Sequence, residues 1–225
     1  MTKVLEENQK LVIVFNHASP LSWLPAIALL AAHVTARGGG SRKPVGVMDR
    51  LFFEVPFVKQ LAGLLTQFEN PPSFLDLTSS FVDGDATDLV VFPEGSNCFF
   101  GDPAELKPFR SAKFVELAIR ANAPIYVCVH KGSEAWGKVL PVPPNWLEML
   151  HVLPPIVQTF LKSRVESTGQ FTLPMWPTAM ERFEMWGTLY HPTLKASDLS
   201  EDKEEKLRQL TNEADAIREI MLKRS

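Results

Sequence analysis

The sequence predicts an α/β protein in which a central sheet, mostly parallel or mixed, is flanked by helices. Short apolar runs rich in β-branched residues, as at 11–15 and 88–92, have the length of buried strands. Between such runs, apolar side chains recur every three or four residues, as in amphipathic helices. Strands that alternate with helices favour a layered α/β fold. With 225 residues, of which 45% are hydrophobic, the chain can bury one sizeable core.

The first strand and helix are predicted close to the N-terminus. Leu11 to Phe15 is the strand, because all five residues are apolar. Ser19 is expected to cap the following helix, with Pro20 at its first position. We expect this helix to run to about Ala36, where the glycines at 38–40 end it.

The middle of the chain repeats this alternation. A second strand is predicted at 45–48, and a helix at 56–65 follows from apolar residues at helical spacing. The strand at 88–92 comes next. A helix over 111–122 and a strand over 124–129 complete the predicted core.

The last third of the chain gives a weaker signal. Residues 141–192 are rich in proline and tryptophan and show no clear period, so only Leu189 and Tyr190 indicate a short strand. From about 200 to 223, apolar residues three and four apart predict a helix, and Ser200 is expected to cap it.

Composition and charge limit the classes of function. The formal net charge of −3 gives no reason to expect nucleic-acid binding. Cys98 and Cys128 have neither metal-site spacing nor a disulfide framework, so we expect no metal ion and a cytoplasmic, reducing setting. The longest apolar stretch, 23–36, is shorter than the ~20 residues that span a bilayer. We expect a single domain over 1–225, with its chemistry in a core at about 11–136.

Two polar segments follow predicted strands and carry the candidate chemistry. Residues 16–22 read Asn-His-Ala-Ser-Pro-Leu-Ser, and residues 91–96 read Val-Phe-Pro-Glu-Gly-Ser. In open α/β sheets, ligands bind beyond the carboxyl ends of the strands. His17 and Glu94 are therefore candidates for one shared crevice.

Each candidate has a functional and a structural interpretation. The dipole of the following helix favours a neutral His17, which can act as a general base, or the ring only caps that helix. Pro93 stiffens the strand exit before Glu94, and Gly95 permits a tight turn whose N–H groups can bind an oxyanion or phosphate. An ordinary surface turn is the alternative. His130, at the end of another predicted strand, either lines the same crevice or is structural.

Together, these segments resemble the glycerolipid acyltransferase family, the 1-acylglycerol-3-phosphate acyltransferases and their relatives. That family carries Asn-His, four residues and Asp, and later Phe-Pro-Glu-Gly-Thr/Ser-Arg. Here the first motif stands at 16–22 and the second at 92–97. Three further segments match the family pattern. They are the residues at 51–58 that lead into an apolar helix, the Pro-Phe-Arg-Ser run at 108–111, and the strand with the residues that follow it at 124–133.

The resemblance implies a glycerol-3-phosphate acyltransferase-like fold and transfer of an acyl group. The donor is an acyl thioester, on coenzyme A or acyl carrier protein, and no other cofactor is implied. The acceptor is a hydroxyl of a lysophospholipid-like or other lipid. The implied catalytic residues are His17 as general base, Ser22 in place of the motif Asp, and Glu94. The implied substrate-binding residues are Asn16, Ser19, Arg50, Phe92, Pro93, Gly95, Ser96 and Asn97.

The chain departs from the family pattern at three places. Ser22 replaces the Asp, and a hydroxyl brings no charge to stabilise an imidazolium; losing that carboxylate costs about four decades of rate in serine proteases. Asn97 replaces the motif Arg. Asp49 and Glu69 stand where the middle motif has Lys and Arg, with Arg50 adjacent. These changes weaken phosphate binding and favour an acceptor that depends less on phosphate.

Two other functions stay open. In the first, the protein is a weak or inactive relative that binds lipid or acyl chains. In the second, it is a thioesterase, in which water takes the place of the acceptor. It has no Gly-x-Ser-x-Gly elbow, which argues against a serine hydrolase. Access to lipid is expected to be peripheral, on the inner face of a membrane. Candidate contacts are Phe52, Phe53, Phe57 and 146–161, with core packing as the alternative.

Overall fold

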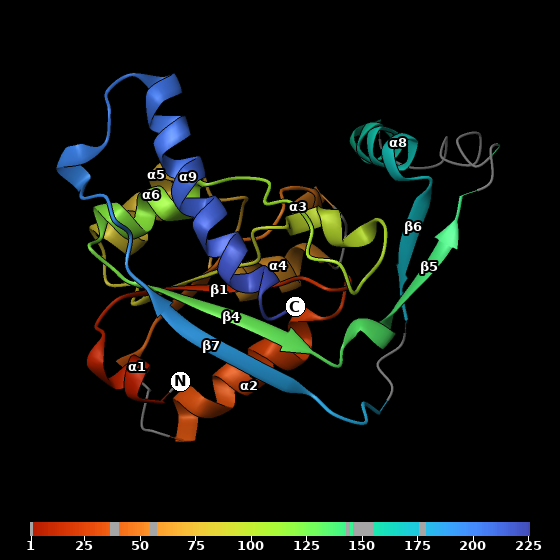
Figure 1. The fold of residues 1–225 in the computed structure, drawn as a ribbon, viewed down its shortest axis with the longest axis horizontal. Helices are drawn as coiled ribbons and strands as arrows, with labels where there is room; N and C mark the ends of the chain where they lie inside the picture. The colour runs from red at the N-terminus through yellow and green to blue at the C-terminus, as the bar shows by residue number, and fades with distance from the viewer. Residues whose placement is uncertain (1, 37–40, 55–57, 143–144, 146–154, 176–178) are drawn as a thin grey trace.

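The computed structural model describes residues 2–36, 41–54, 58–142, 145, 155–175 and 179–225. The fold is mixed α/β and is built on a five-stranded sheet of order β2-β3-β1-β4-β7 (Figure 1). The first four strands in this order are parallel, and β7 is antiparallel to β4. The strands are β1 Leu11–Phe15, β2 Pro44–Gly46, β3 Asp88–Val91, β4 Ile125–Lys131 and β7 Glu184–Tyr190.

Helices cover both faces of this sheet. Val12 and Val14 of β1 pack in one apolar cluster with residues of α6 and α9, while Ile13 and its neighbours pack on α2. Figure 1 shows α1 and α2 on one side of the sheet and α5, α6 and α9 on the other. Because both faces are buried, the parallel strands are continuous apolar runs rather than alternating ones. The helices are α1 Thr2–Glu7, α2 Trp23–Ala36, α3 Leu51–Glu54, α4 Val58–Thr66, α5 Phe74–Leu77, α6 Lys113–Arg120, α8 Pro155–Thr168 and α9 Lys203–Leu222.

The predicted fold class is confirmed, but two predicted caps are wrong. Helix α2 begins at Trp23 rather than near Ser19, because the backbone N–H of Ser22 donates to the Ser19 carbonyl in a separate turn (3.0 Å). Helix α9 is capped by Asp202 instead of Ser200. The Asp202 carboxylate accepts the backbone N–H groups of the next helical turn at 2.9–3.1 Å.

The proline- and tryptophan-rich region contains more regular structure than its pattern predicts. Strands β5 (Gly137–Pro141) and β6 (Gln170–Pro174) pair antiparallel, and α8 lies between them in the chain. This arm extends away from the main sheet in Figure 1. The late strand β7 has seven residues rather than two, because it pairs along the whole of β4.

The residues expected to contact a membrane fall into three groups. Phe53 is buried (5% exposed), and the ring of Phe52 lies 6.2 Å from that of Phe99, so both take part in packing. Phe57 and residues 146–154 lie outside the described residues. Of 155–161, only some side chains are described. Among the described helices, none has the length and apolar composition needed to cross a bilayer.

Candidate active site

The parallel register brings the two motifs together at one edge of the sheet. Val14 of β1 pairs with Val91 of β3, and Phe15 pairs with Cys128 of β4. The segments that follow these strands therefore emerge side by side. The sequence prediction that His17 and Glu94 lie near each other agrees with this geometry.

Glu94 connects the second motif to the first through backbone groups. Its Oε1 accepts the backbone N–H of His17 at 2.7 Å, and its Oε2 accepts the backbone N–H of Lys107 at 2.5 Å. The side chain is buried (1% exposed). Burial raises the pKa of Glu94 to about 7. The hydrogen bonds from the two N–H groups and the charges of Lys107 and Arg218 lower this pKa, but they are smaller effects. Glu94 is thus placed to position the backbone around His17.

The His17 ring lies between an aromatic side chain and a hydroxyl. Its centroid is 5.1 Å from that of Phe92, and its Nδ1 is 3.3 Å from Oγ of Ser22. Burial, followed by the charge of His130, lowers the pKa of His17 to about 3, while the Ser19 backbone opposes this shift. The ring is therefore neutral at physiological pH, with burial as the largest cause.

The hydrogen bonds of Ser22 fix the tautomer of His17. The Ser22 hydroxyl donates its only proton to the Ser19 carbonyl at 2.8 Å and accepts the Ser19 N–H at 3.1 Å. Toward the ring, Oγ can then only accept, so Nδ1 of His17 carries the hydrogen. A neutral imidazole has one N–H, and Nε2 is left with a free lone pair. That is the tautomer a general base requires, obtained here without a carboxylate.

His130 and Asn16 form a buried clamp between β1 and β4. The Asn16 side chain donates to the His130 carbonyl at 3.0 Å and accepts its backbone N–H at 2.8 Å. The His130 Nε2 lies 2.9 Å from the Asn16 carbonyl, and its Nδ1 lies 3.3 Å from Oγ of Ser133. Because a carbonyl only accepts, Nε2 carries the hydrogen and Nδ1 accepts. His130 is fully buried, and burial lowers its pKa to about 4, so its role here is structural.

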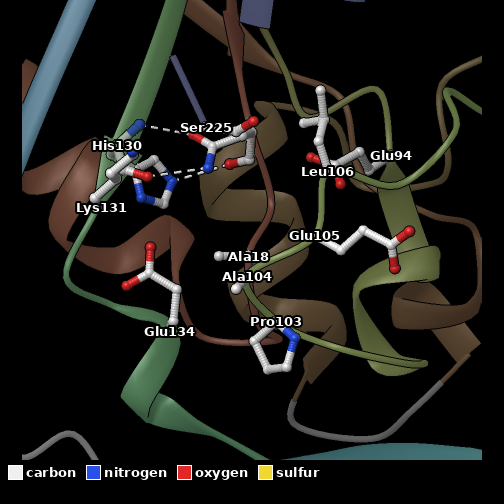
Figure 2. A pocket seen from close by; sticks show the side chains of 11 residues that line it. Ala18, Glu94, Pro103, Ala104, Glu105, Leu106, His130, Lys131, Glu134 and Ser225 are labelled. Carbon is white, nitrogen blue, oxygen red and sulfur yellow. Dashed lines mark hydrogen bonds between the residues drawn. The ribbon is translucent and has the colours of Figure 1, made fainter. Parts of the chain in front are cut away.

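A cavity of about 170 Å³ lies next to this clamp (Figure 2). Its lining includes Asn16, Ala18, Glu94 and His130 together with Glu105, Lys131 and Glu134. The residues on either side of His17 belong to the lining, whereas the His17 ring packs on Phe92. The cavity thus includes Glu94 and the two neighbours of His17, but His17 itself is not part of its lining.

The turn after β3 is contacted by a cation from the loop before α6, Arg110, which the sequence analysis did not single out. Arg110 Nη1 donates to Oγ of Ser96 at 2.5 Å and forms an ion pair with Asp49, and Ser96 donates to the same Asp49 oxygen at 3.0 Å. Gly95 has φ +53°, and a Cβ there would lie 3.1 Å from Cδ of Arg110. The Pro-Phe-Arg-Ser run at 108–111 was the only sequence signal for Arg110.

The remaining predicted site residues differ in where they lie. Ser19 is buried and donates to the Ser133 carbonyl at 3.3 Å. Asn97 donates to the Pro108 carbonyl at 3.0 Å. Arg50 is not brought into the site: its exposed side chain lies 3.8 Å from that of Glu54. Phe92 and Pro93 lie in the turn, where the Pro93 carbonyl accepts the N–H of Arg110 at 2.8 Å.

Two other chemistries find no support among the described residues. Burial raises the pKa of the Cys98 thiol well above its ordinary value, which disfavours a nucleophilic thiolate. No group of three or more His, Cys, Asp or Glu side chains is arranged to hold a metal ion in the described part of the chain.

Comparison with known proteins agrees with the motifs. A protein-family model described as "Acyltransferase" matches residues 2–131, more than half of the chain. Searches of curated proteins and of solved structures found no match. The matched residues include both motifs and the strands β1, β3 and β4 that bring them together. The chain is therefore a member of the acyltransferase family.

Proposed function

We propose that the protein transfers an acyl group from an acyl thioester to a hydroxyl of a lipid acceptor, with His17 as general base. The observation that carries this proposal is the Ser22 hydrogen-bond set, which leaves Nε2 of His17 unprotonated. Membership of the acyltransferase family supports acyl transfer in general.

The proposed reaction needs only one proton-transferring side chain. Nε2 of His17 removes the proton of the acceptor hydroxyl as its oxygen attacks the thioester carbonyl carbon. The tetrahedral intermediate collapses, the C–S bond breaks, and the imidazolium returns the proton to the leaving thiolate. Ser22 holds the His17 ring in its orientation but adds no negative charge. The imidazolium is therefore less stabilised than in a His–Asp pair.

The turn at 92–97 is the proposed place of the acceptor. Glu94 holds this turn to the backbone of His17, so an acceptor bound against Phe92, Pro93 and Gly95 lies close to the base. The Asp49 carboxylate already engages Ser96 and Nη1 of Arg110. This arrangement supports an acceptor whose binding does not depend on a phosphate at Ser96, such as a lipid alcohol.

Release of free thiol from long-chain acyl-CoA, with and without a monoacylglycerol or lysophospholipid acceptor, tests the proposal. We expect thiol release and new ester only when an acceptor is present, and acyl carrier protein is tested as the alternative donor. Thiol release without an acceptor would show a thioesterase instead. Saturable binding of acyl chains with no product from any donor and acceptor would show a non-catalytic lipid-binding relative.

A further inference from the structure

A chain of hydrogen bonds reaches Glu94 through the peptide group between Asn16 and His17. The N–H of this group belongs to His17 and donates to Oε1 of Glu94 at 2.7 Å. Its carbonyl belongs to Asn16 and accepts Nε2–H of His130 at 2.9 Å. The peptide bond is trans, so His130 and Glu94 lie on opposite sides of it. His130 thus donates to the same peptide group through which Glu94 holds the backbone of the proposed base.

A second chain of the same construction reaches the other oxygen of Glu94. The N–H of Lys107 donates to Oε2 at 2.5 Å, and the carbonyl of the same peptide group, that of Leu106, accepts Nη2–H of Arg218 at 3.2 Å. Leu106, Glu94 and His130 line the same cavity (Figure 2). A hydrogen bond to a carbonyl polarises its peptide group and makes the N–H a stronger donor. Both N–H groups that bind Glu94 are strengthened in this way.

Arg218 also acts on Glu94 through its charge. It lies on α9, beyond the residues 2–131 that match the family model. Its Nε is buried and has no hydrogen-bond partner among the described residues, which costs free energy. The attraction between this cation and Glu94 offsets that cost, and the same attraction lowers the pKa of Glu94 against the effect of burial.

Only an ionised Glu94 serves both chains fully. A carboxylate has two equivalent acceptor oxygens, and each of them here accepts one backbone N–H. The protonated acid has one carbonyl oxygen and one hydroxyl, whose oxygen is a weaker acceptor and whose hydrogen needs a partner of its own. Protonation of Glu94 therefore loosens the backbone at His17 or at Lys107.

Glu94 is the group that changes charge near pH 7 in this surrounding. Burial lowers the pKa of His17 to about 3 and that of His130 to about 4, and it raises the pKa of Cys98, so these three stay neutral near pH 7. The pKa of Glu94 is about 7. The titratable and charged side chains around Glu94 are His17, Cys98, Glu105, Lys107, His130, Lys131, Glu134 and Arg218.

We propose that Arg218 and His130 are positioning residues for acyl transfer, which keep Glu94 a carboxylate that accepts both backbone N–H groups. The inference rests on the proposed function and adds two residues to it. Arg218 contributes a charge and a hydrogen bond, and His130 contributes a hydrogen bond alone. Both act through Glu94 on the backbone of His17, so the rate of acyl transfer follows the ionisation of Glu94.

A titration of Glu94 by carboxyl carbon NMR from pH 5 to pH 9 tests the effect of Arg218 directly. The signal of Glu94 is identified by its loss in Glu94→Gln. We expect Arg218→Gln to raise the midpoint by roughly one pH unit, because loss of a nearby positive charge favours the neutral acid. Arg218→Lys keeps the charge and should recover most of this shift. Arg208→Gln removes an exposed cation from the same helix and should leave the midpoint unchanged.

The pH dependence of kcat provides the second readout. A midpoint raised by roughly one unit lowers the ionised fraction of Glu94 at pH 7 about fivefold, and kcat of Arg218→Gln should fall by that factor. At pH 9 Glu94 is ionised in both proteins, so the difference in kcat should nearly close. General damage to the fold would lower kcat at every pH instead.

Two substitutions of His130 test the other chain. His130→Gln keeps an N–H donor that can reach the Asn16 carbonyl, whereas His130→Leu removes it. We expect His130→Leu to raise the Glu94 midpoint by less than Arg218→Gln does, since no charge is lost, and His130→Gln to stay closer to the wild type. Where His130→Leu does not fold, His130→Gln and the Arg218 variants decide.

An unchanged Glu94 midpoint in folded Arg218→Gln would overturn the inference, and so would an equal loss of kcat at pH 7 and pH 9. If the wild type forms ester while either result is seen, the proposed function stands and only the positioning role is refuted. A wild type that forms no ester refutes the proposed function, and the NMR titration still decides whether Arg218 and His130 control the charge of Glu94.

Discussion

At the scale of single residues, the Ser22 hydroxyl stands where the family motif has an Asp carboxylate. It can perform one of the two tasks of that carboxylate, orienting the histidine ring, but not the other, supplying negative charge. Ser22 orients the ring of His17 and sets its tautomer, because its own proton is committed to the Ser19 carbonyl. It does not supply the negative charge that stabilises an imidazolium. The site thus holds a neutral imidazole, the form that the proposed general base requires, and is less suited to holding the protonated form.

Replacing Ser22 by alanine should lower kcat roughly 10- to 100-fold, below the four-decade cost of a wrongly oriented ring in serine proteases. The KM for the acceptor should change little, because the acceptor is proposed to bind against Phe92, Pro93 and Gly95, and Ser22 is fully buried. The loss of the turn contact should also cost about 1 kcal/mol of stability. Steady-state kinetics and urea unfolding measure the two effects. Ser22→Thr keeps the hydroxyl and serves as the comparison; an unchanged kcat in Ser22→Ala would contradict the orienting role.

Glu94 should make stability depend on pH in an unusual direction for a carboxyl group. Its pKa is raised from the ordinary 4.5 to about 7, so the folded state binds more protons than the unfolded state between these values. The stabilisation of the folded state by Glu94 is fully present below about pH 4.5 and is lost as pH rises to about 7. Relative to Glu94→Gln, the unfolding free energy of the wild type should therefore fall by up to about 3 kcal/mol across this range.

Urea unfolding of the wild type and Glu94→Gln at pH 5 and pH 7.5 measures the difference between their unfolding free energies. A difference that does not change with pH would contradict the raised pKa of Glu94. His17 and His130 act in the opposite direction. His17 and His130 have lowered pKa values, so their contribution is present above about 6.5 and is lost as pH falls toward 3–4. Because both proteins keep these histidines, the comparison isolates Glu94.

At the scale of elements, the buried parallel strands were predictable and the antiparallel ones were not. The residues of β1 and β3 are fully apolar or buried on both faces, which leaves a clear signal in the sequence. The residues of β7 are mostly half-buried and lack strict alternation, so their strand depends on pairing with β4, a partner more than fifty residues away. The β5–β6 arm likewise forms through a long-range pairing that no local pattern encodes.

The exit of β4 depends on a glycine, and its substitution should be costly. Gly132 has φ +105°, and a Cβ there would lie 2.0 Å from the Arg182 carbonyl oxygen in the segment before β7. We expect Gly132→Ala to lose at least about 2 kcal/mol through backbone strain and overpacking. Gly169→Ala is the control, since Gly169 also has positive φ (+64°) but meets nothing within 4 Å. Equal losses in thermal unfolding would show that the Arg182 contact is unimportant.

At the scale of the whole molecule, the candidate site is assembled from segments that are distant in the chain. Sequence reasoning found His17, Ser22 and Glu94 because each lies in a motif at a strand end. It did not find what Glu94 binds, since backbone N–H groups carry no residue signature. It also missed Arg110, whose approach to Ser96 and Asp49 depends on how the loop after β3 folds back. Arg50 was expected instead, from its place next to Asp49.

The central claim is that the neutral ring of His17 takes the acceptor proton during acyl transfer. Acceptor-dependent ester formation by wild type, His17→Ala and His33→Ala tests it most directly. His33 lies on α2, where its Nδ1 is 3.0 Å from the Leu29 carbonyl, and it controls for loss of a histidine. We predict a 10²- to 10⁴-fold loss in folded His17→Ala, the contribution typical of a general base, and full activity in His33→Ala. Ester formation at the wild-type rate in His17→Ala would contradict the account.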